Sequence, residues 1–276
     1  MPAKGVPSAK LSQGKKNPYP YVMAAALVCL LLLSLYLRLV HVDFGLPSFL
    51  HVDETGPITQ TQHLLNGHVG KLNYNHPPLL KNLAYVGLKG YLALKAKPFA
   101  SDQEVVLALR LFSVLAGVGA VAFLYLLGCH FVDRRLAFVT AFLYAILPLT
   151  VMTSKYGVPD MLLSFLYILS LWLSIKLYKQ PTPALYGATG LVLMLAFGAK
   201  YPGCFLALPA FLAHFMASRR EAAAGSPVPV GKSLGFFLLG SLIGLCVSFP
   251  LLFIELPKII NGFLNEVQHV MISGHE

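Results

Sequence analysis

Long apolar blocks separated by short polar segments dominate the sequence. Most of these blocks approach the roughly 20 residues that a helix needs to cross the hydrocarbon core of a bilayer. The blocks cover residues 21–40, 105–128, 136–153, 159–178, 183–199, 202–217 and 233–254. The pattern predicts an all-α polytopic membrane protein with about seven transmembrane helices. In the last block, Gly240 and Gly244 have the four-residue spacing that lets two such helices pack closely.

A long polar segment, residues 41–104, follows the first block. It has about 64 residues, far more than a simple connection needs. Two amphipathic stretches lie within it. One places Ile58, Leu64 and Leu65 on one side, and the other, residues 79–94, repeats leucines at helical spacing with lysines between them. Such stretches favour helices in the plane of the membrane interface; the alternative is that they cover a small core of the loop itself.

The composition supports a membrane protein and excludes several other classes. Hydrophobic residues make up 57% of the chain and charged residues only 12%, whereas a soluble domain carries about twice that charged fraction. The net charge of +10 would suggest nucleic acid as the partner of a soluble protein. Here the basic residues are dispersed between apolar blocks, so the lipid bilayer is the expected partner and nucleic acid is not.

The basic residues also predict the orientation in a plasma or inner membrane. Lysines are frequent in the polar segment 1–20, which the positive-inside rule places in the cytoplasm as an N-terminal tail. If the blocks then alternate in direction, every short inside loop carries at least two basic residues. The 41–104 segment and the turns around residues 154–159 and 199–202 then lie outside.

This threading concentrates the polar chemistry on the external face. Nine of the eleven acidic residues fall outside, whereas a pump or channel places ionisable groups within its spans. A transporter or flippase for a lipid-linked sugar, or a non-catalytic scaffold, is the alternative. A transporter would need broken helices with polar groups near the midplane; Pro148 and Pro209 interrupt spans without an accompanying charge.

The external loop contains two candidate elements of an active site. The first is the adjacent pair Asp53 and Glu54, in which one carboxylate can take a proton from an attacking hydroxyl while the other orients the loop. The second is His76-Pro77-Pro78-Leu79, which has the proline-rich character of a helix start, where an anion is favoured. A solvated acid pair and a plain helix start are the alternatives.

Basic residues on the external side indicate an anionic partner. Lys155 and Lys200 lie in tight external turns, where the positive-inside rule does not place them. Arg38 and Arg110 lie near the outer ends of the first two blocks. Taken singly, each of these side chains could simply reach the lipid headgroups. Taken together, they predict a site for an anion such as a phosphate.

No metal ligands can be assigned from the sequence. The external histidines and acids have spacings that match no standard zinc pattern; they are His51, Asp53, Glu54, His63, His68, His76 and Asp160. The sequence therefore assigns no cofactor. A divalent metal ion is the one cofactor that these side chains could bind.

These residues, in this order, resemble a known family. The set comprises Asp53-Glu54, His76-Pro77-Pro78-Leu79, Arg110, Asp160 and Lys200. It looks like the GT-C type membrane glycosyltransferases, and more narrowly it is similar to glycosyltransferase family 39. That family includes the dolichyl-phosphate-mannose protein mannosyltransferases and the lipid A aminoarabinose transferases. The resemblance covers essentially the whole chain as an N-terminal module, 21–254, whose external catalytic loop is 41–104.

The resemblance implies roles for individual residues. Asp53 would be the catalytic carboxylate with Glu54 beside it, Asp160 a second acid facing the cavity, and Lys200 a residue near the donor phosphate. The implied substrate-binding residues are His76, Lys81, Arg110, Lys155, Asp160 and Lys200. Members often have Lys-Gly-Pro where this chain has Lys200-Tyr201-Pro202-Gly203.

The implied reaction is an inverting transfer of a mannose-like hexose. The donor would be a sugar on a polyprenyl phosphate such as dolichyl phosphate, and the acceptor a hydroxyl of a protein, lipid or glycan on the extracytoplasmic face. Full members continue for several more spans. We therefore expect 255–276 to be the start of a truncated external segment, and the chain alone to be inactive.

Overall fold

The computed structural model describes residues 19–48, 51–225, 228–269 and 272, and every regular element within these ranges is a helix. The α-helices are α1 (Tyr19–Leu39), α2 (Thr55–Leu65), α3 (Leu79–Lys95), α4 (Asp102–Gly128), α5 (Arg134–Ile146), α6 (Pro148–Thr153), α7 (Asp160–Lys179), α8 (Pro183–Ala199), α9 (Ala207–Ala223), α10 (Val230–Ser248) and α11 (Leu252–Gln268). Short 3-10 helices are η1 (Val52–Glu54), η2 (Val69–Lys71) and η3 (Tyr201–Leu206). The predicted all-α class is confirmed; the segments 1–18 and 273–276 of the expected tails lie outside the described residues.

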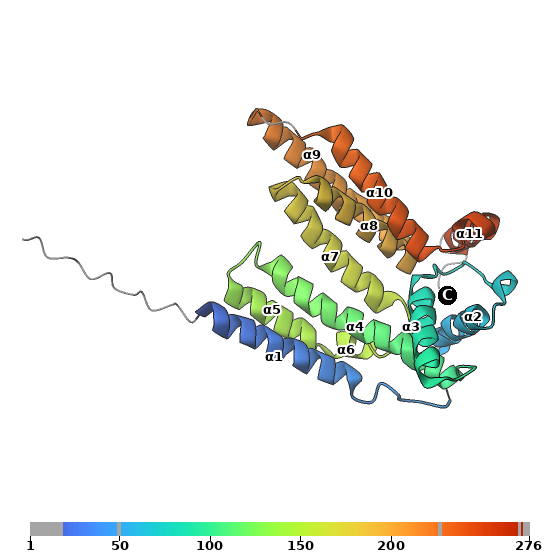
Figure 1. Ribbon diagram of the computed structural model, residues 1–276. Coiled ribbons are helices and arrows are strands. Elements are labelled where there is room, and N and C mark those ends of the chain that lie inside the picture. The colour runs from blue at the N-terminus through green and yellow to red at the C-terminus, as the bar shows by residue number, and fades with distance from the viewer. Residues whose placement is uncertain (1–18, 49–50, 226–227, 270–271, 273–276) are drawn as a thin grey trace, which may run out of the picture.

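The long helices run side by side and alternate in direction, as the threading predicts (Figure 1). Helices α2, α3 and α11 gather at one end of the bundle, which we call the loop end. The opposite end, which we call the basic end, is formed by the last residues of α4, α7 and α9 and the first residues of α5, α8 and α10. The predicted loop and turns therefore meet at the loop end.

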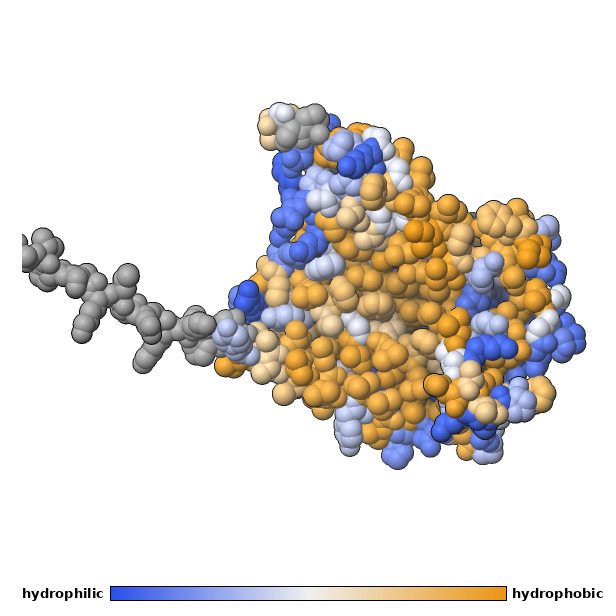
Figure 2. Space-filling view, in the orientation of Figure 1, coloured by the Kyte–Doolittle hydropathy of each residue, from blue (hydrophilic) through white to orange (hydrophobic). Residues whose placement is uncertain are grey.

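Five helical segments in the described ranges are long and apolar enough to cross a membrane. They are Tyr21–Leu39, Asp102–Gly128, Asp160–Lys179, Tyr201–Ala223 and Val230–Ser248. The other two predicted spans are also helical, but α8 has 17 residues and α5 has 13. Figure 2 shows apolar residues along the sides of the bundle and hydrophilic residues mainly toward its ends, the pattern of a surface that meets lipid.

The third block is two helices, α5 and α6, so the prediction of one continuous span over 136–153 was wrong. Pro148 lacks the N–H that would bond the Tyr144 carbonyl and ends the first helix. The Thr150 hydroxyl donates to that carbonyl at 2.7 Å, and Arg38 Nη1 donates to the Ala145 carbonyl at 3.0 Å. Side chains thus replace the helical bonds lost at the break. Arg38, expected near an external anion, is fully buried here.

Helices α8 and α10 approach closely through their glycines, which confirms the packing role predicted for Gly240 and Gly244. A Cβ at Gly240 would collide with the carbonyl of Gly187, and one at Gly244 would lie 2.6 Å from the carbonyl oxygen of Leu191. Only hydrogen fits at these positions. Backbone-to-backbone contact of this kind is how apolar helices associate when water does not drive them together.

Replacing Gly240 by leucine is expected to lower the thermal unfolding temperature of the detergent-solubilised protein, because α10 must move away from α8. Overpacking alone costs about 1–3 kcal/mol. Gly235 lies in the same helix and has no atom within 4 Å of a built Cβ, so Gly235→Leu is the matched control. Equal unfolding temperatures for the two variants would contradict the packing role.

Candidate active site

Glu54 and Arg110 form a fully buried ion pair at the loop end. Arg110 donates from Nε to Glu54 Oε1 at 2.8 Å and from Nη2 to Oε2 at 2.7 Å, and both side chains are 0% exposed. The two parallel bonds are the geometry in which a guanidinium binds a carboxylate most strongly. The pair fixes the first part of the 41–104 loop to the first half of α4.

The remaining donors of Arg110 hold the chain that leaves α1. Its Nη1 donates to the carbonyls of Val42 and Phe44 at 2.8 and 2.9 Å. The Phe44 ring lies under the guanidinium, with 4.3 Å from Cζ to the ring centroid, which adds a cation–π contact. Arg110 was expected to face the donor, but the structure places it in the protein interior, where each of these contacts positions the loop.

The turn before α7 is attached to the same pair. The Gly157 N–H donates to Glu54 Oε1 at 2.6 Å. A Cβ at Gly157 would lie 2.9 Å from Cβ of Leu109, so only glycine permits this approach. Lys155, expected to bind an anion, donates from Nζ to the Val40 carbonyl at 2.6 Å. Loop and turn therefore form one rigid unit around Glu54.

Asp53 lies beside this unit but differs from Glu54 in its environment. The two residues are neighbours in η1, so their side chains leave the backbone in different directions, and Asp53 is exposed. Its carboxylate makes no hydrogen bond or ion pair with the residues that the structure describes. The preceding His51 packs its ring on Tyr156 at 4.1 Å between centroids, which attaches this stretch to the turn. Asp53 is thus an available acceptor on a fixed backbone.

Asp160 and Lys200 form a second ion pair at the loop end. Asp160 is the first residue of α7 and Lys200 follows α8; Lys200 Nζ lies 2.9 Å from Asp160 Oδ1. The side chains are 52% and 37% exposed, so solvent or a ligand reaches both. An ammonium has three donors, and this contact with Asp160 uses one of them.

The His-Pro-Pro segment is fixed to the far side of the bundle. The Tyr201 hydroxyl donates to the Tyr74 carbonyl at 2.5 Å, and Asn82 Nδ2 donates to the Ser248 carbonyl at 2.8 Å. These contacts join the 41–104 loop to η3 and to the end of α10. Gly262 of α11 also packs against the backbone of Tyr74. The loop therefore connects both halves of the bundle at this end.

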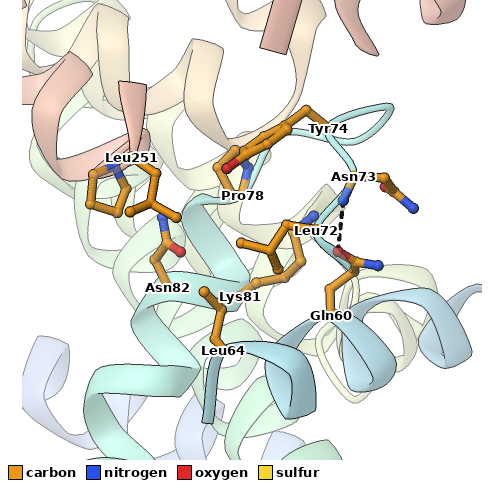
Figure 3. Close-up of a pocket in the computed structure, with 10 residues that line it drawn as sticks. Gln60, Leu64, Leu72, Asn73, Tyr74, Pro78, Lys81, Asn82 and Leu251 are labelled. Atoms are coloured by element: carbon orange, nitrogen blue, oxygen red, sulfur yellow. Dashed lines mark hydrogen bonds between the residues drawn. The ribbon is translucent and has the colours of Figure 1, made fainter. Parts of the chain in front are cut away.

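Lys81 occupies a small cavity next to this segment (Figure 3). The cavity is lined by Gln60, Leu64, Leu72, Asn73, Tyr74, Pro78, Lys81, Asn82, Pro250 and Leu251. Lys81 is 6% exposed and donates from Nζ to the His76 carbonyl at 3.0 Å. Burial lowers the pKa of Lys81 to about 8, because the charged form is poorly solvated there. The His76 residue that accepts this bond is itself exposed.

The described residues contain no group of three His, Cys, Asp or Glu side chains placed to hold a metal ion. A divalent metal at this end of the molecule stays a prediction from the sequence.

The predicted residues thus form three groups rather than one. Glu54 lies with Arg110, Asp160 with Lys200, and Lys81 with the carbonyl of His76. Within the described residues, no hydrogen bond or ion pair joins the Asp53 carboxylate to any of the three groups. Sequence reasoning assigned no role to Gln60, Tyr74, Asn82 and Tyr201, whose hydrogen bonds hold the loop to itself, to η3 and to the end of α10. The sequence offered one indication of their importance: Tyr74 and Asn82 flank the Pro-Pro segment, and Tyr201 belongs to the Lys-Tyr-Pro-Gly segment.

Comparison with known proteins identifies the family. The family model described as dolichyl-phosphate-mannose-protein mannosyltransferase matches residues 100–252, more than half of the chain. The chain belongs to this family. The match includes Arg110, Asp160 and Lys200, and Asp53, His76 and Lys81 lie outside it.

A solved structure supports the mannosyltransferase-family fold over a longer part of the chain. The S. cerevisiae protein O-mannosyltransferase Pmt1–Pmt2 complex bound to the sugar donor matches with a TM-score of 0.59 and 19% sequence identity. The likeness covers 86% of this chain and 34% of the yeast chain, so this chain spans about a third of that protein. A search of curated protein sequences gives no match. The chain therefore has the GT-C type module of this family.

Proposed function

We propose that this chain belongs to a membrane mannosyltransferase that transfers mannose from a polyprenyl-phosphate carrier to an acceptor hydroxyl, with the site on the extracytoplasmic face and the N-terminus in the cytoplasm. The observation that carries the proposal is the contrast between two adjacent carboxylates. Glu54 has both oxygens bonded to a buried arginine, whereas Asp53 is exposed and unpaired among the described residues. A fixed backbone that presents one available carboxylate suits a general base.

In the proposed reaction, Asp53 accepts the proton of the acceptor hydroxyl. The hydroxyl oxygen attacks the anomeric carbon from the face opposite the phosphate and forms the new glycosidic bond. The bond from the anomeric carbon to the phosphate oxygen breaks, and the electron pair leaves with the polyprenyl phosphate. The transition state resembles an oxocarbenium ion, as in glycosyl chemistry generally, and the configuration inverts.

The leaving phosphate gains charge as the bond breaks, so cations beside it stabilise the transition state more than the bound donor. Lys200 is the best placed for this role because its ammonium is partly exposed and uses one contact on Asp160. Lys81 and the exposed His76 form the second group that faces the loop. Arg110 and Lys155 instead hold the loop and the turn in place.

The assay that tests the function uses the full-length gene product in its native lipid with radiolabelled polyprenyl-phosphate mannose. Label that moves from the lipid to a hydroxyl acceptor supports the proposal. Label that crosses the bilayer while it stays on the lipid supports a flippase, and label that is bound but neither moved nor released supports a scaffold.

Replacing Lys200 by glutamine is expected to lower kcat and kcat/KM for the donor by about tenfold or more, since a hydrogen bond to a charged group contributes about 1.5–3 kcal/mol. The control is Lys258→Gln, because Lys258 also has a partly exposed ammonium paired with a carboxylate, that of Glu255. An unchanged kcat/KM in Lys200→Gln, measured by initial rates of label transfer, would remove Lys200 from the site.

The pH dependence should report Lys81 if its ammonium attracts the donor phosphate. Its pKa of about 8 means that the charge is present below this pH and is lost as the pH rises through it. We expect kcat/KM for the donor, which reports the free enzyme, to fall above about pH 8. Lys81→Met should have a lower kcat/KM without this fall; the same alkaline fall in both proteins would assign it to another group.

A further inference from the structure

A second cavity lies between α7, α8, α9 and α10, away from the candidate active site; it extends from the basic end, at the last turn of α7 and the first turns of α8 and α10, inward to the first half of α9. It has a volume of about 300 Å³, at the lower end of the range for ligand pockets. Its lining comes from α7, α8, α9 and α10 and consists of Leu177, Tyr186, Thr189, Ala207, Ala210, Phe211, His214, Val230, Ser233, Leu234 and Phe237. Nearly all of the surface that these residues present is apolar.

The cavity lies where lipid can reach it. Helix α9 packs mainly on α7, and α10 packs mainly on α8. Of the lining residues, Phe211 on α9 is 64% exposed and Leu234 on α10 is 53% exposed. In a membrane-spanning bundle, side chains exposed on these helices face acyl chains rather than water. The described residues thus leave the cavity open to an acyl chain on the side of α9 and α10.

Four polar side chains, those of Tyr186, Thr189, His214 and Ser233, interrupt the apolar lining and mark it as more than a packing gap. His214 binds the Tyr186 hydroxyl through Nδ1 at 2.5 Å, which leaves Nε2 as its other ring nitrogen. Ser233 is 1% exposed, and its hydroxyl has no hydrogen-bond partner among the described residues. An ionisable residue within a membrane helix is uncommon and usually functional.

Positive charge surrounds the cavity at the basic end. Lys179 follows the lining residue Leu177 by two positions, and Lys232 directly precedes Ser233. The Arg220 guanidinium packs over the Tyr178 ring at 5.1 Å and donates to the Lys179 carbonyl at 3.2 Å. Lys232 is exposed and forms no ion pair within the described part of the chain. Glu221 forms an ion pair with Arg220.

We propose that this cavity binds one acyl chain of an anionic phospholipid from the leaflet at the basic end, with the lipid phosphate on Lys232 and the neighbouring basic residues. The apolar lining suits the chain, the lateral opening admits it, and the unpaired lysine selects a negative headgroup. The site is independent of the proposed transferase site, which lies at the loop end. Failure of one proposal leaves the other standing.

The test uses the full-length protein in phosphatidylcholine nanodiscs that contain a small fraction of phosphatidylglycerol with a diazirine on its acyl chain. After irradiation, we expect label on peptides of α9 and α10. Ala210→Phe, which fills the cavity from α9, should lose this label. Leu212→Phe adds a similar ring to the same helix at a position that is 48% exposed and outside the lining, and it should keep the label.

A second variant keeps the test decisive if Ala210→Phe folds poorly. Lys232→Gln changes only an exposed side chain and should reduce labelling by the anionic probe toward that of a phosphatidylcholine probe. Equal labelling of wild type, Ala210→Phe and Lys232→Gln would overturn the proposal. Equal labelling of wild type by the anionic and the phosphatidylcholine probes would also overturn it. A label that is displaced by added polyprenyl phosphate but not by unlabelled phosphatidylglycerol would likewise overturn it, because the cavity would then bind a different lipid.

Discussion

Replacing Asp53 by asparagine is expected to abolish mannosyl transfer by the full-length protein without changing its stability. General base catalysis contributes about 10²- to 10⁴-fold to a rate, and an amide at this position cannot take the proton of the acceptor. Because the Asp53 side chain is exposed and its carboxylate forms no hydrogen bond or ion pair with the described residues, its loss removes no polar interaction that holds the fold.

The measurement is the rate of label transfer at saturating donor, together with thermal unfolding of the same preparation. Asp43→Asn is the matched control because Asp43 is an exposed carboxylate of the same external loop. Transfer by Asp43→Asn should stay near that of wild type. Near-normal transfer by Asp53→Asn would assign the base to another residue.

Replacing Glu54 by glutamine should instead destabilise the protein. The substitution leaves the Arg110 guanidinium buried at 0% exposure without its counter-charge. Removing one partner of a buried pair costs about 3–5 kcal/mol, because the remaining charge is uncompensated. We expect a large fall in the unfolding temperature, and a fall in activity that follows from displacement of the loop.

A double variant separates the charge from the geometry. Glu54→Leu combined with Arg110→Met replaces the pair by apolar side chains of similar size, an exchange that is often neutral for stability. Its unfolding temperature should lie above that of Glu54→Gln. The donors that hold Val42 and Phe44 are lost in this variant, so low activity in a stable double variant would show that Arg110 positions the loop.

The membrane helices could be predicted because hydrophobic solvation alone decides them. An apolar block in lipid must form a helix, because no water is present to bond its backbone. The short turns between blocks then make successive helices run in opposite directions. The break at Pro148 was harder to predict, because it depends on whether Arg38 and Thr150 are present to satisfy the freed carbonyls. Those partners are distant in the sequence or belong to the next helix.

The candidate site shows the same division. The residue types and their order were enough to select Asp53, Glu54, Asp160 and Lys200. The sequence could not show which of the adjacent acids is buried, because one residue of rotation in η1 exchanges their environments. Lys81 was expected between apolar positions on a polar face of its helix; the structure buries it, since α3 packs on α2 and α4 with a different face.

Helix α11 was also missed. The sequence places its residues after the last apolar block, in a segment that we expected to begin a truncated external region. In the structure it packs beside Tyr74, with Gly262 at the contact. Only the tertiary contact shows that this segment closes the loop end.

The central claim is that two neighbouring carboxylates have different tasks, one chemical and one structural. The most direct test measures unfolding temperature and the rate of mannosyl transfer for Asp53→Asn and Glu54→Gln, on identical preparations of the full-length protein. The account predicts that Asp53→Asn keeps the wild-type unfolding temperature and loses transfer, whereas Glu54→Gln unfolds at a much lower temperature. Wild-type unfolding temperatures for both variants, with equal losses of transfer, would contradict it.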